Sequence, residues 1–357
     1  MEKLKVLHIV EALGGGVYSY FIDLTNYFGK DQETVTTIIY SDKRPEIMPG
    51  KIKKDFNKNV QLINVPMSKE ISIFKDISSL INLIKHIKRL RPNIIHLHSS
   101  KMSVVGRLAY VFSFSKSKLF YTPHGYAFLR QDVSYIKKLL YYFIEKTVPF
   151  FGGETIACGD TEFNYAKKFG KASLIRNGIN IENVIKLMSN TPKKKLTFGT
   201  LGRITHARNP KLFNEIALQN PKINFLWIGD GELKHLITAK NVKITGWFMN
   251  RDEGIKKLNN IDVYLQTSLW EGLPIALLEA MAMKKPIIAT NIIGNKDIVK
   301  HAETGYLFSS LSEFNGFLKF LKNKDKREAL GNKGFKRLRL MFNSTRNFNA
   351  MKNIYKT

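Results

Sequence analysis

Short apolar runs that alternate with helical patterns constrain the fold of this chain more than any other feature. The first runs occupy residues 4–10, 35–40, 61–65, 94–97, 118–121 and 155–157, and helical patterns such as 73–90 and 102–112 separate them. The rhythm breaks at Arg176-Asn-Gly, and a surface-like stretch reaches Lys195. A second series follows at 196–201, 225–229, 242–245, 263–266 and 287–290. Because such alternation produces mostly parallel sheets covered by helices, we expect two doubly wound α/β domains.

Length and composition agree with two compact domains. The 357 residues suit two domains of roughly 150 to 180 residues each, and the apolar share of 44% can fill two cores. No uncharged apolar stretch reaches about 18 residues, so no membrane-spanning helix is predicted. The short apolar opening runs into a glycine turn, which does not match a secretory signal. The lone Cys158 excludes an internal disulfide, as a cytoplasmic protein would favour.

The charge balance is strongly basic. The chain has 57 Lys plus Arg against 29 Asp plus Glu, a formal net charge of +28. Nucleic acid and an anionic membrane surface are both physically reasonable partners for this charge. Residues 135–144 mix lysines with aromatic and aliphatic side chains at near-helical spacing, which is typical of helices that lie at a membrane surface. The alternative interpretation of residues 135–144 is a helix face that is solvated by water.

The segment from Glu271 to Glu279, Glu-Gly-Leu-Pro-Ile-Ala-Leu-Leu-Glu, places a carboxylate inside an otherwise apolar helix. Such a buried carboxylate is costly unless something hydrogen-bonds it, so a polar ligand is the leading explanation. The alternative is an ion pair between Glu279 and a buried Arg or Lys. Pro274 suits a first helical turn, so a helix N-terminus that can receive an anion is expected just after Glu271.

This segment resembles the E-x7-E motif of the retaining GT-B glycosyltransferases of family 4. The resemblance implies two Rossmann-like domains that face an interdomain cleft, with a C-terminal helix that crosses back to the N-terminal domain. We place the N-terminal, acceptor-side domain at 1–178, the nucleotide-sugar-binding domain at 179–335 and the returning helix at 336–357. In this family the second Glu hydrogen-bonds the ribose of the donor, which implies that role for Glu279. The first Glu and the backbone after it face the donor sugar and phosphate, here Glu271, Gly272, Leu273 and Pro274.

Residues after the strand at 196–201 resemble the family signature whose Arg and Lys grip the donor diphosphate. Arg203 keeps the first position, whereas Arg208 replaces the usual Lys and Asn209 the usual Gly. Cations are needed there because the leaving nucleoside diphosphate gains negative charge as the glycosidic bond breaks. Arg208 has a second interpretation as an exposed residue at a helix start. The chain has no Asp-x-Asp pair to hold a metal on the diphosphate, so no metal and no cofactor are expected.

The first domain supplies further candidates through the same resemblance. Pro123-His-Gly matches the strand-end His-Gly of the family, which implies that His124 approaches the hydroxyls of the donor sugar. Gly15 and Gly16 lie in a glycine turn where backbone can approach phosphate or acceptor without a Cβ in the way. His96 and His98 match an H-x-H signature whose role we take as structural. Phe248 falls where main-chain groups usually meet the base.

These residues predict a metal-independent, retaining glycosyltransferase in which His124, Glu271 and Arg203 are the catalytic candidates. The donor-binding set comprises Gly15, Gly16, Arg203, Arg208, Phe248, Glu271, Gly272, Leu273, Pro274 and Glu279. We expect transfer of a hexose or N-acetylhexosamine from a UDP-sugar to a glycan acceptor carried on a lipid, in capsule, lipopolysaccharide or exopolysaccharide synthesis. The expected location is the cytoplasm, at the inner face of the cell membrane. A GT-B sugar-nucleotide epimerase is the enzymatic alternative; a nucleic-acid-binding protein rests on charge alone, and no nucleic-acid partner is expected.

Overall fold

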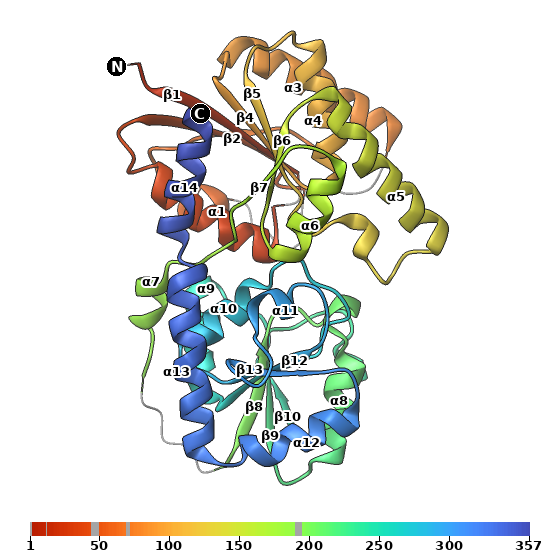
Figure 1. The fold of residues 1–357 in the computed structure, drawn as a ribbon, viewed down its shortest axis with the longest axis vertical. Helices are drawn as coiled ribbons and strands as arrows, with labels where there is room; N and C mark the ends of the chain where they lie inside the picture. The colour runs from red at the N-terminus through yellow and green to blue at the C-terminus, as the bar shows by residue number, and fades with distance from the viewer. Residues whose placement is uncertain (1, 12, 44–49, 69–71, 190–194) are drawn as a thin grey trace. The chain divides into compact units, whose positions relative to one another are not determined.

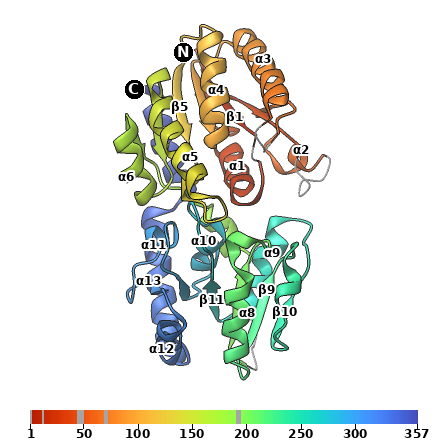
Figure 2. The same cartoon turned by 90° about the vertical axis from the view of Figure 1, so that its right-hand side faces the viewer.

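The computed structural model describes residues 2–11, 13–43, 50–68, 72–189 and 195–357, which form two compact units. The first unit comprises Met1–Asn177 and Thr345–Thr357, and the second comprises Gly178–Ser344. Each unit is built on one parallel sheet with helices on both faces (Figures 1 and 2). The predicted fold of two Rossmann-like, doubly wound domains is therefore confirmed.

The first unit has a seven-stranded sheet in the order β3-β2-β1-β4-β5-β6-β7. Its strands are β1 (Leu4–Val10), β2 (Thr34–Tyr40), β3 (Gln61–Asn64), β4 (Ile94–His98), β5 (Lys118–Thr122), β6 (Glu154–Ala157) and β7 (Ala172–Leu174). Its helices are α1 (Gly15–Phe28), α2 (Lys51–Asp55), α3 (Ile73–Leu90), α4 (Ser100–Phe112), α5 (Tyr135–Thr147), α6 (Asp160–Phe169) and α14 (Ser344–Lys356), with short 3₁₀ helices η1 (Ala127–Leu129) and η2 (Val148–Phe151). Apart from β7, every strand here was predicted within about two residues.

Alternate strand residues of the first unit face two separate cores, because successive side chains of a strand point to opposite faces of the sheet. Val6 and Val10 of β1 pack on the α1 face, whereas Leu7 and Ile9 pack against α3 and α4 on the other face. His8 lies between Val6 and Val10 and therefore points to the α1 face. This parity also carries the histidines of β4 to the α1 face.

The C-terminal helix α14 belongs to the first unit, as the fold prediction required. Phe348, Met351 and Tyr355 enter the same buried cluster as α1, and Figure 1 shows α14 beside α1. Lys352 anchors the helix through ion pairs with Asp31 Oδ1 at 3.0 Å and Glu33 Oε2 at 2.6 Å. The segment that returns to the first unit begins at Thr345, whereas we expected it to begin at residue 336.

The second unit has a six-stranded sheet in the order β10-β9-β8-β11-β12-β13. Its strands are β8 (Thr197–Leu201), β9 (Asn224–Ile228), β10 (Val242–Ile244), β11 (Val263–Gln266), β12 (Ile287–Thr290) and β13 (Gly305–Phe308). Its helices are α7 (Ile181–Ile185), α8 (Pro210–Gln219), α9 (Arg251–Lys257), α10 (Ile275–Ala282), α11 (Asn295–Ile298), α12 (Leu311–Leu321) and α13 (Lys324–Met341), with 3₁₀ helices η3 (His206–Arg208), η4 (Lys234–Leu236) and η5 (Leu258–Asn260). Because all strands are parallel, their carboxyl ends lie along one edge of the sheet.

The apolar helix α10 is central to the second unit. Seven of its eight residues are buried, and α13 packs against it. The opposite face of the sheet packs on α8 and α12 through a cluster that includes Phe213, Trp227 and Phe314. A helix that is apolar on every side is expected to be buried in this way, and it holds the segment from Glu271 to Glu279 in a fixed place.

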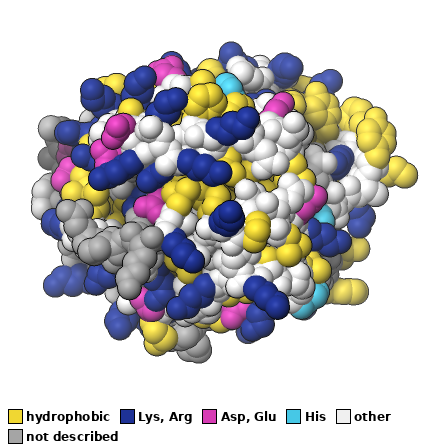
Figure 3. Space-filling model, turned by 90° about the horizontal axis from the view of Figure 1, so that it is seen from below, with side chains coloured by type: hydrophobic (Ala, Val, Ile, Leu, Met, Phe, Trp, Pro, Cys, Tyr) yellow, Lys and Arg dark blue, Asp and Glu magenta, His cyan; other side chains and the backbone are white. Residues whose placement is uncertain are grey.

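The surface carries the basic charge over a wide area. Figure 3 shows Lys and Arg side chains spread over one face, with Asp and Glu scattered among them. Among the described residues, no helix combines the length and the apolarity that crossing a bilayer requires.

Candidate functional site

The carboxyl ends of β8 and β11 bring together most of the polar residues predicted in the second domain. These two strands are parallel neighbours, so the turn after β8, with Arg203 and Arg208, lies beside the turn after β11, with Glu271. Ligands of parallel sheets bind at such edges, where side chains and free backbone groups converge. Arg203 is exposed and directly follows Gly202 on this turn.

Arg208 lies inside this group of residues. Its Nη1 atom is 2.9 Å from Gln266 Oε1 and 3.4 Å from Glu271 Oε1, and its side chain is only 20% exposed. The guanidinium lies against Gly202, where an added Cβ would be 3.2 Å from Arg208 Cζ. The alternative interpretation of Arg208 as an exposed helix-start residue is therefore wrong. Burial alone would lower the pKa of Arg208, but Glu271 and Tyr264 raise it above its ordinary value, so this group stays charged.

Glu271 is held by three donors. Its Oε1 atom accepts hydrogen bonds from Gln266 Nε2 at 3.0 Å and Ser268 Oγ at 2.8 Å, besides the contact with Arg208. Gly294, at a φ of +88°, allows close approach, since an added Cβ would lie 2.9 Å from Glu271 Cβ. The carboxylate is thus fixed before any ligand binds. Gln266 and Ser268 were not predicted, because their role depends on neighbours that only the folded sheet supplies.

Helix α10 begins at Ile275, directly after Gly272, Leu273 and Pro274. Leu273 and Pro274 are buried, whereas Gly272 is partly exposed. The first backbone N–H groups of a helix lack partners within the helix, and the helix dipole makes this end favourable for an anion. The turn between Glu271 and Ile275 therefore combines a fixed carboxylate with anion-binding backbone.

Glu279 has the cationic partner that the sequence left as an alternative. Its Oε1 atom is 2.7 Å from Arg251 Nε, and the side chains are 5% and 18% exposed, respectively. Arg251 is the first residue of α9. Phe248 packs on the same helix, since an added Cβ on Gly254 would lie 2.8 Å from the Phe248 ring. Glu279, Arg251 and Phe248 are thus joined through α9, and no pattern in the sequence singles out Arg251.

In the first unit, His124 directly follows β5 in a left-handed backbone conformation with a φ of +55°. Its Nε2 atom is 2.9 Å from His98 Nδ1, and burial lowers the pKa of His124 to about 3. The ring is therefore neutral near pH 7. Gly15, with a φ of +55°, begins α1 and has open space where a Cβ would lie. Gly15 and Gly16 are both exposed, as close approach to their backbone requires.

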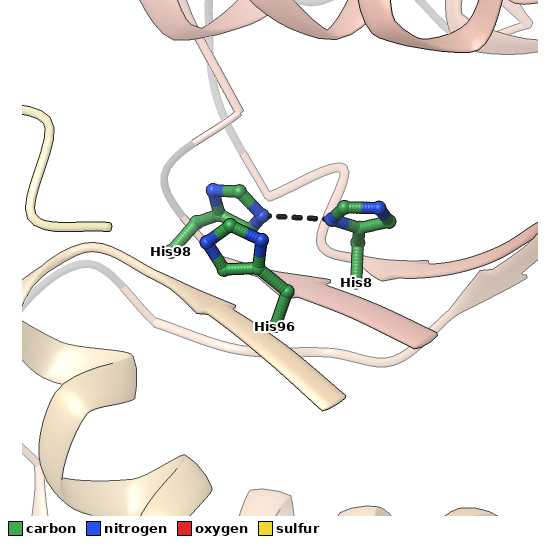
Figure 4. Close-up of side chains that lie close together, drawn as sticks. All are labelled: His8, His96 and His98. Atoms are coloured by element: carbon green, nitrogen blue, oxygen red, sulfur yellow. Dashed lines mark hydrogen bonds between the residues drawn. The ribbon is translucent and has the colours of Figure 1, made fainter. Parts of the chain in front are cut away.

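His8, His96 and His98 form a buried group in the first unit (Figure 4). One ligand atom from each lies within 4.8 Å of the others, so the group has the residues for a metal site. Both ring nitrogens of His98 are hydrogen-bonded, to His8 and His124, and both nitrogens of His96 are bonded, to Tyr355 and Thr122. An ion would have to displace these bonds. The structural role expected for His96 and His98 agrees with these contacts, but His8 was not predicted.

Comparisons with known proteins agree with these two units. The family described as "Glycosyltransferase Family 4" matches residues 14–183, and "Glycosyl transferases group 1" matches residues 183–337. The UDP-Gal:alpha-D-GlcNAc-diphosphoundecaprenol alpha-1,3-galactosyltransferase of Escherichia coli is 30% identical over 306 residues, which cover 76% of each chain. The capsular polysaccharide biosynthesis glycosyltransferase CapM of Staphylococcus aureus is 24% identical over 345 residues, or 86% of this chain and 88% of that protein.

A solved structure shows the same fold. Anabaena Alr3699/HepE, in complex with UDP and glucose, superposes with a TM-score of 0.76 at 15% identity, covering 99% of this chain and 100% of that one. Two parallel sheets, the GT-B architecture and the two family matches lead to one assignment. The chain belongs to the family 4 glycosyltransferases of GT-B fold and is related to the glycosyltransferases of bacterial capsule and O-antigen synthesis.

Proposed function

We propose that this glycosyltransferase is a retaining enzyme that moves a hexose or N-acetylhexosamine from a UDP-sugar to a lipid-linked glycan. The reaction would serve capsule, lipopolysaccharide or exopolysaccharide synthesis at the cytoplasmic face of the membrane. Support for the donor and acceptor comes from the E. coli relative, whose name specifies UDP-Gal and a diphosphoundecaprenol acceptor.

The observation that carries this proposal is the group formed by Arg208, Gln266, Ser268 and Glu271 beside the N-terminus of α10. A cation and free backbone N–H groups suit the diphosphate, and a fixed carboxylate suits the hydroxyls of the sugar. In the transfer, the bond between the sugar and the phosphate oxygen breaks and a bond to the acceptor oxygen forms. The acceptor proton passes to an oxygen of the leaving diphosphate. Arg203 and Arg208 stabilise the negative charge that develops on this leaving group.

His124 and Glu271 orient and polarise the donor sugar and form no covalent bond to it. A neutral His124 can donate or accept a hydrogen bond, and the donors around Glu271 keep its carboxylate in one orientation. Glu279 accepts hydrogen bonds from the ribose hydroxyls while one of its oxygens remains paired with Arg251. A carboxylate has about four lone-pair positions, so these roles are compatible. Phe248 and the backbone near it contact the base.

The test is incubation of the full chain with UDP-, GDP- and ADP-sugars and a synthetic acceptor, GlcNAc linked through diphosphate to a lipid. Mass spectrometry should detect an acceptor longer by one hexose or N-acetylhexosamine with a UDP-sugar, and NMR should show that the anomeric configuration of the donor is kept. An inverted product would contradict the retaining mechanism. Conversion of the sugar nucleotide without acceptor would indicate an epimerase instead.

A membrane-docking face is proposed on α5 and η2. Tyr135, Ile136 and Phe143 of α5 are 78%, 78% and 50% exposed, and Leu140 and Phe150 are exposed beside them. Soluble surfaces rarely expose so many large apolar side chains together, and Lys137 and Lys146 on the same helix are exposed as well. Apolar side chains with flanking lysines are typical of helices that lie in the interface of an anionic bilayer.

Replacing Ile136 and Phe143 together by Glu should weaken binding to vesicles that contain phosphatidylglycerol. Each apolar side chain contributes about 1.5–3 kcal/mol when it leaves water, so we expect a loss of at least ~10-fold in the partition coefficient. Co-sedimentation with vesicles measures this loss. Leu218→Glu, a change at an exposed apolar residue of α8, is the matched control and should bind as the unmodified chain does. Equal binding of the double variant and the control would contradict the proposed docking face.

A further inference from the structure

A row of three imidazoles connects His124 to the interior of the first unit. His124 Nε2 lies 2.9 Å from His98 Nδ1, and His98 Nε2 lies 2.9 Å from His8 Nδ1. Figure 4 shows the inner bond, between His98 of β4 and His8 of β1. The row exists because β1, β4 and β5 are neighbours and place alternate side chains on the same face of the sheet.

The two hydrogen bonds couple the protons of the three rings. Burial lowers the pKa of His8 and His124 to about 3 and that of His98 well below its ordinary value, so each ring is neutral and carries one proton. Each bond needs one donor and one acceptor. The rings must therefore share one tautomer: either all three carry the proton on Nδ1, or all three carry it on Nε2.

The inner end of the row favours one of these two arrangements. Among the described residues, His8 Nε2 and His124 Nδ1 have no hydrogen-bond partner. The His8 ring lies among aromatic rings, with centroids 6.1 Å from those of Phe21 and Phe28. Within the described part of the chain, each arrangement leaves an N–H without a partner at one end of the row and a bare lone pair at the other end. His8 is 0% exposed, whereas the His124 residue is partly exposed, so the N–H without a partner is better placed on His124 than in the interior. This places every proton of the row on Nδ1.

We propose that His98, with its proton direction set by His8, is a positioning residue that holds His124 in the Nδ1–H tautomer. His124 Nδ1, which is buried and has no partner among the residues described for the free protein, then carries the hydrogen-bond donor that an oxygen of the bound sugar accepts, a statement that rests on the proposed function. The row itself does not depend on the substrate. In water, a neutral histidine favours the Nε2–H tautomer, so the proposed state of His124 differs from that of a free side chain.

The tautomers can be read by NMR of the full chain with ¹⁵N-labelled histidine and without substrate, each ring being assigned by substitution. We expect His8, His98 and His124 all to carry the proton on Nδ1. An Nε2–H tautomer of His124 would overturn the proposal. A zinc-dependent change in the NMR signals of these three rings that persists after dialysis would also overturn the proposal. It would indicate a metal centre instead of a hydrogen-bonded row.

Substitution separates a positioning role from a merely structural one. His98→Leu removes the neighbour of His124, and we expect the Nε2–H tautomer of His124 to appear and kcat to fall by ~10-fold, with the KM for the donor little changed. His98→Asn, whose amide can still donate to His124 Nε2, should restore both. The matched control is His96→Leu, which removes a buried histidine from the same strand but outside the row, and it should leave the tautomer of His124 unchanged.

Two outcomes of these substitutions would overturn the proposal. One is an unchanged tautomer of His124 in His98→Leu, and the other is the appearance of the Nε2–H tautomer of His124 in His96→Leu. Thermal unfolding of each variant shows whether it is folded. Because the tautomer is measured without donor or acceptor, a failure of this proposal differs from a failure of the proposed reaction. If the tautomers are as expected but the protein transfers no sugar from a UDP-sugar, the proposed function is wrong, whereas the proposed tautomers of the three histidines still hold.

Discussion

Arg208→Ala should lower kcat by ~10²- to 10³-fold, the largest effect expected from a single substitution in this chain. The guanidinium lies 3.4 Å from Glu271 and is partly buried, where its charge acts on the leaving diphosphate with little screening by water. Since the diphosphate gains charge mainly in the transition state, kcat should fall more than the affinity for the donor. Arg208→Lys should recover part of the loss, because lysine keeps the charge but not the planar fork. Steady-state kinetics with the preferred UDP-sugar measures each effect.

Lys211→Ala is the matched control for Arg208. It removes one positive charge from the exposed side of α8, three residues further along the chain, and its kinetics should stay within about twofold of the unmodified chain. Arg203→Ala, on the same turn as Arg208, should also slow transfer. Full activity of Arg208→Ala would contradict the assignment of the diphosphate site.

Glu279→Ala should reduce the affinity for UDP by ~30-fold or more, which corresponds to about 2 kcal/mol for the lost hydrogen bonds to the ribose. It should also destabilise the second unit, because the largely buried charge of Arg251 would lose its ion pair with Glu279. Isothermal titration calorimetry measures the first effect, and thermal unfolding measures the second. The loss of stability makes this single variant ambiguous.

A pair of further variants resolves the ambiguity between ligand binding and ion pairing. Combining Arg251→Met with Glu279→Leu removes both charges, and replacement of a buried ion pair by apolar residues often leaves stability unchanged or higher. We expect this double variant to unfold near the temperature of the unmodified chain but still to bind UDP weakly. Arg251→Met alone keeps Glu279 and should retain UDP affinity within about threefold. If the double variant binds UDP normally, the pair has only a structural role.

The fold was predictable because its signals are local. The runs at 4–10, 263–266 and 287–290 match β1, β11 and β12, and the pattern at 73–90 matches α3. Buried parallel strands are short apolar runs, and amphipathic helices repeat every 3.6 residues, so a single sequence displays both. The edge strand β7 (Ala172–Leu174) and β13 (Gly305–Phe308) were missed because each is too short and too mixed to show such a pattern.

Candidate site residues could be named from the sequence only where a motif exists. Glu271, Glu279 and His124 belong to recognisable segments, but the residues that hold them do not. Arg251 pairs with Glu279 across 28 residues of chain, and His8 reaches His98 across 90. Such partners are set by sheet order and by the side of a strand on which a residue falls. The alternative of an exposed Arg208 could not be excluded from the sequence for the same reason, because the burial of Arg208 depends on Gly202 and on β11.

The central claim is that the edge of the second sheet, with Arg208, Glu271 and Glu279, binds the nucleoside diphosphate of the donor. Its most direct test is the thermal unfolding of the full chain and of Arg208→Ala with increasing UDP. Binding to the folded state alone stabilises by about 2.7 kcal/mol at 100 times the dissociation constant. We predict that UDP raises the unfolding temperature of the unmodified chain and that Arg208→Ala needs much more UDP for the same rise. No rise with UDP, or equal rises in both proteins, would contradict the claim.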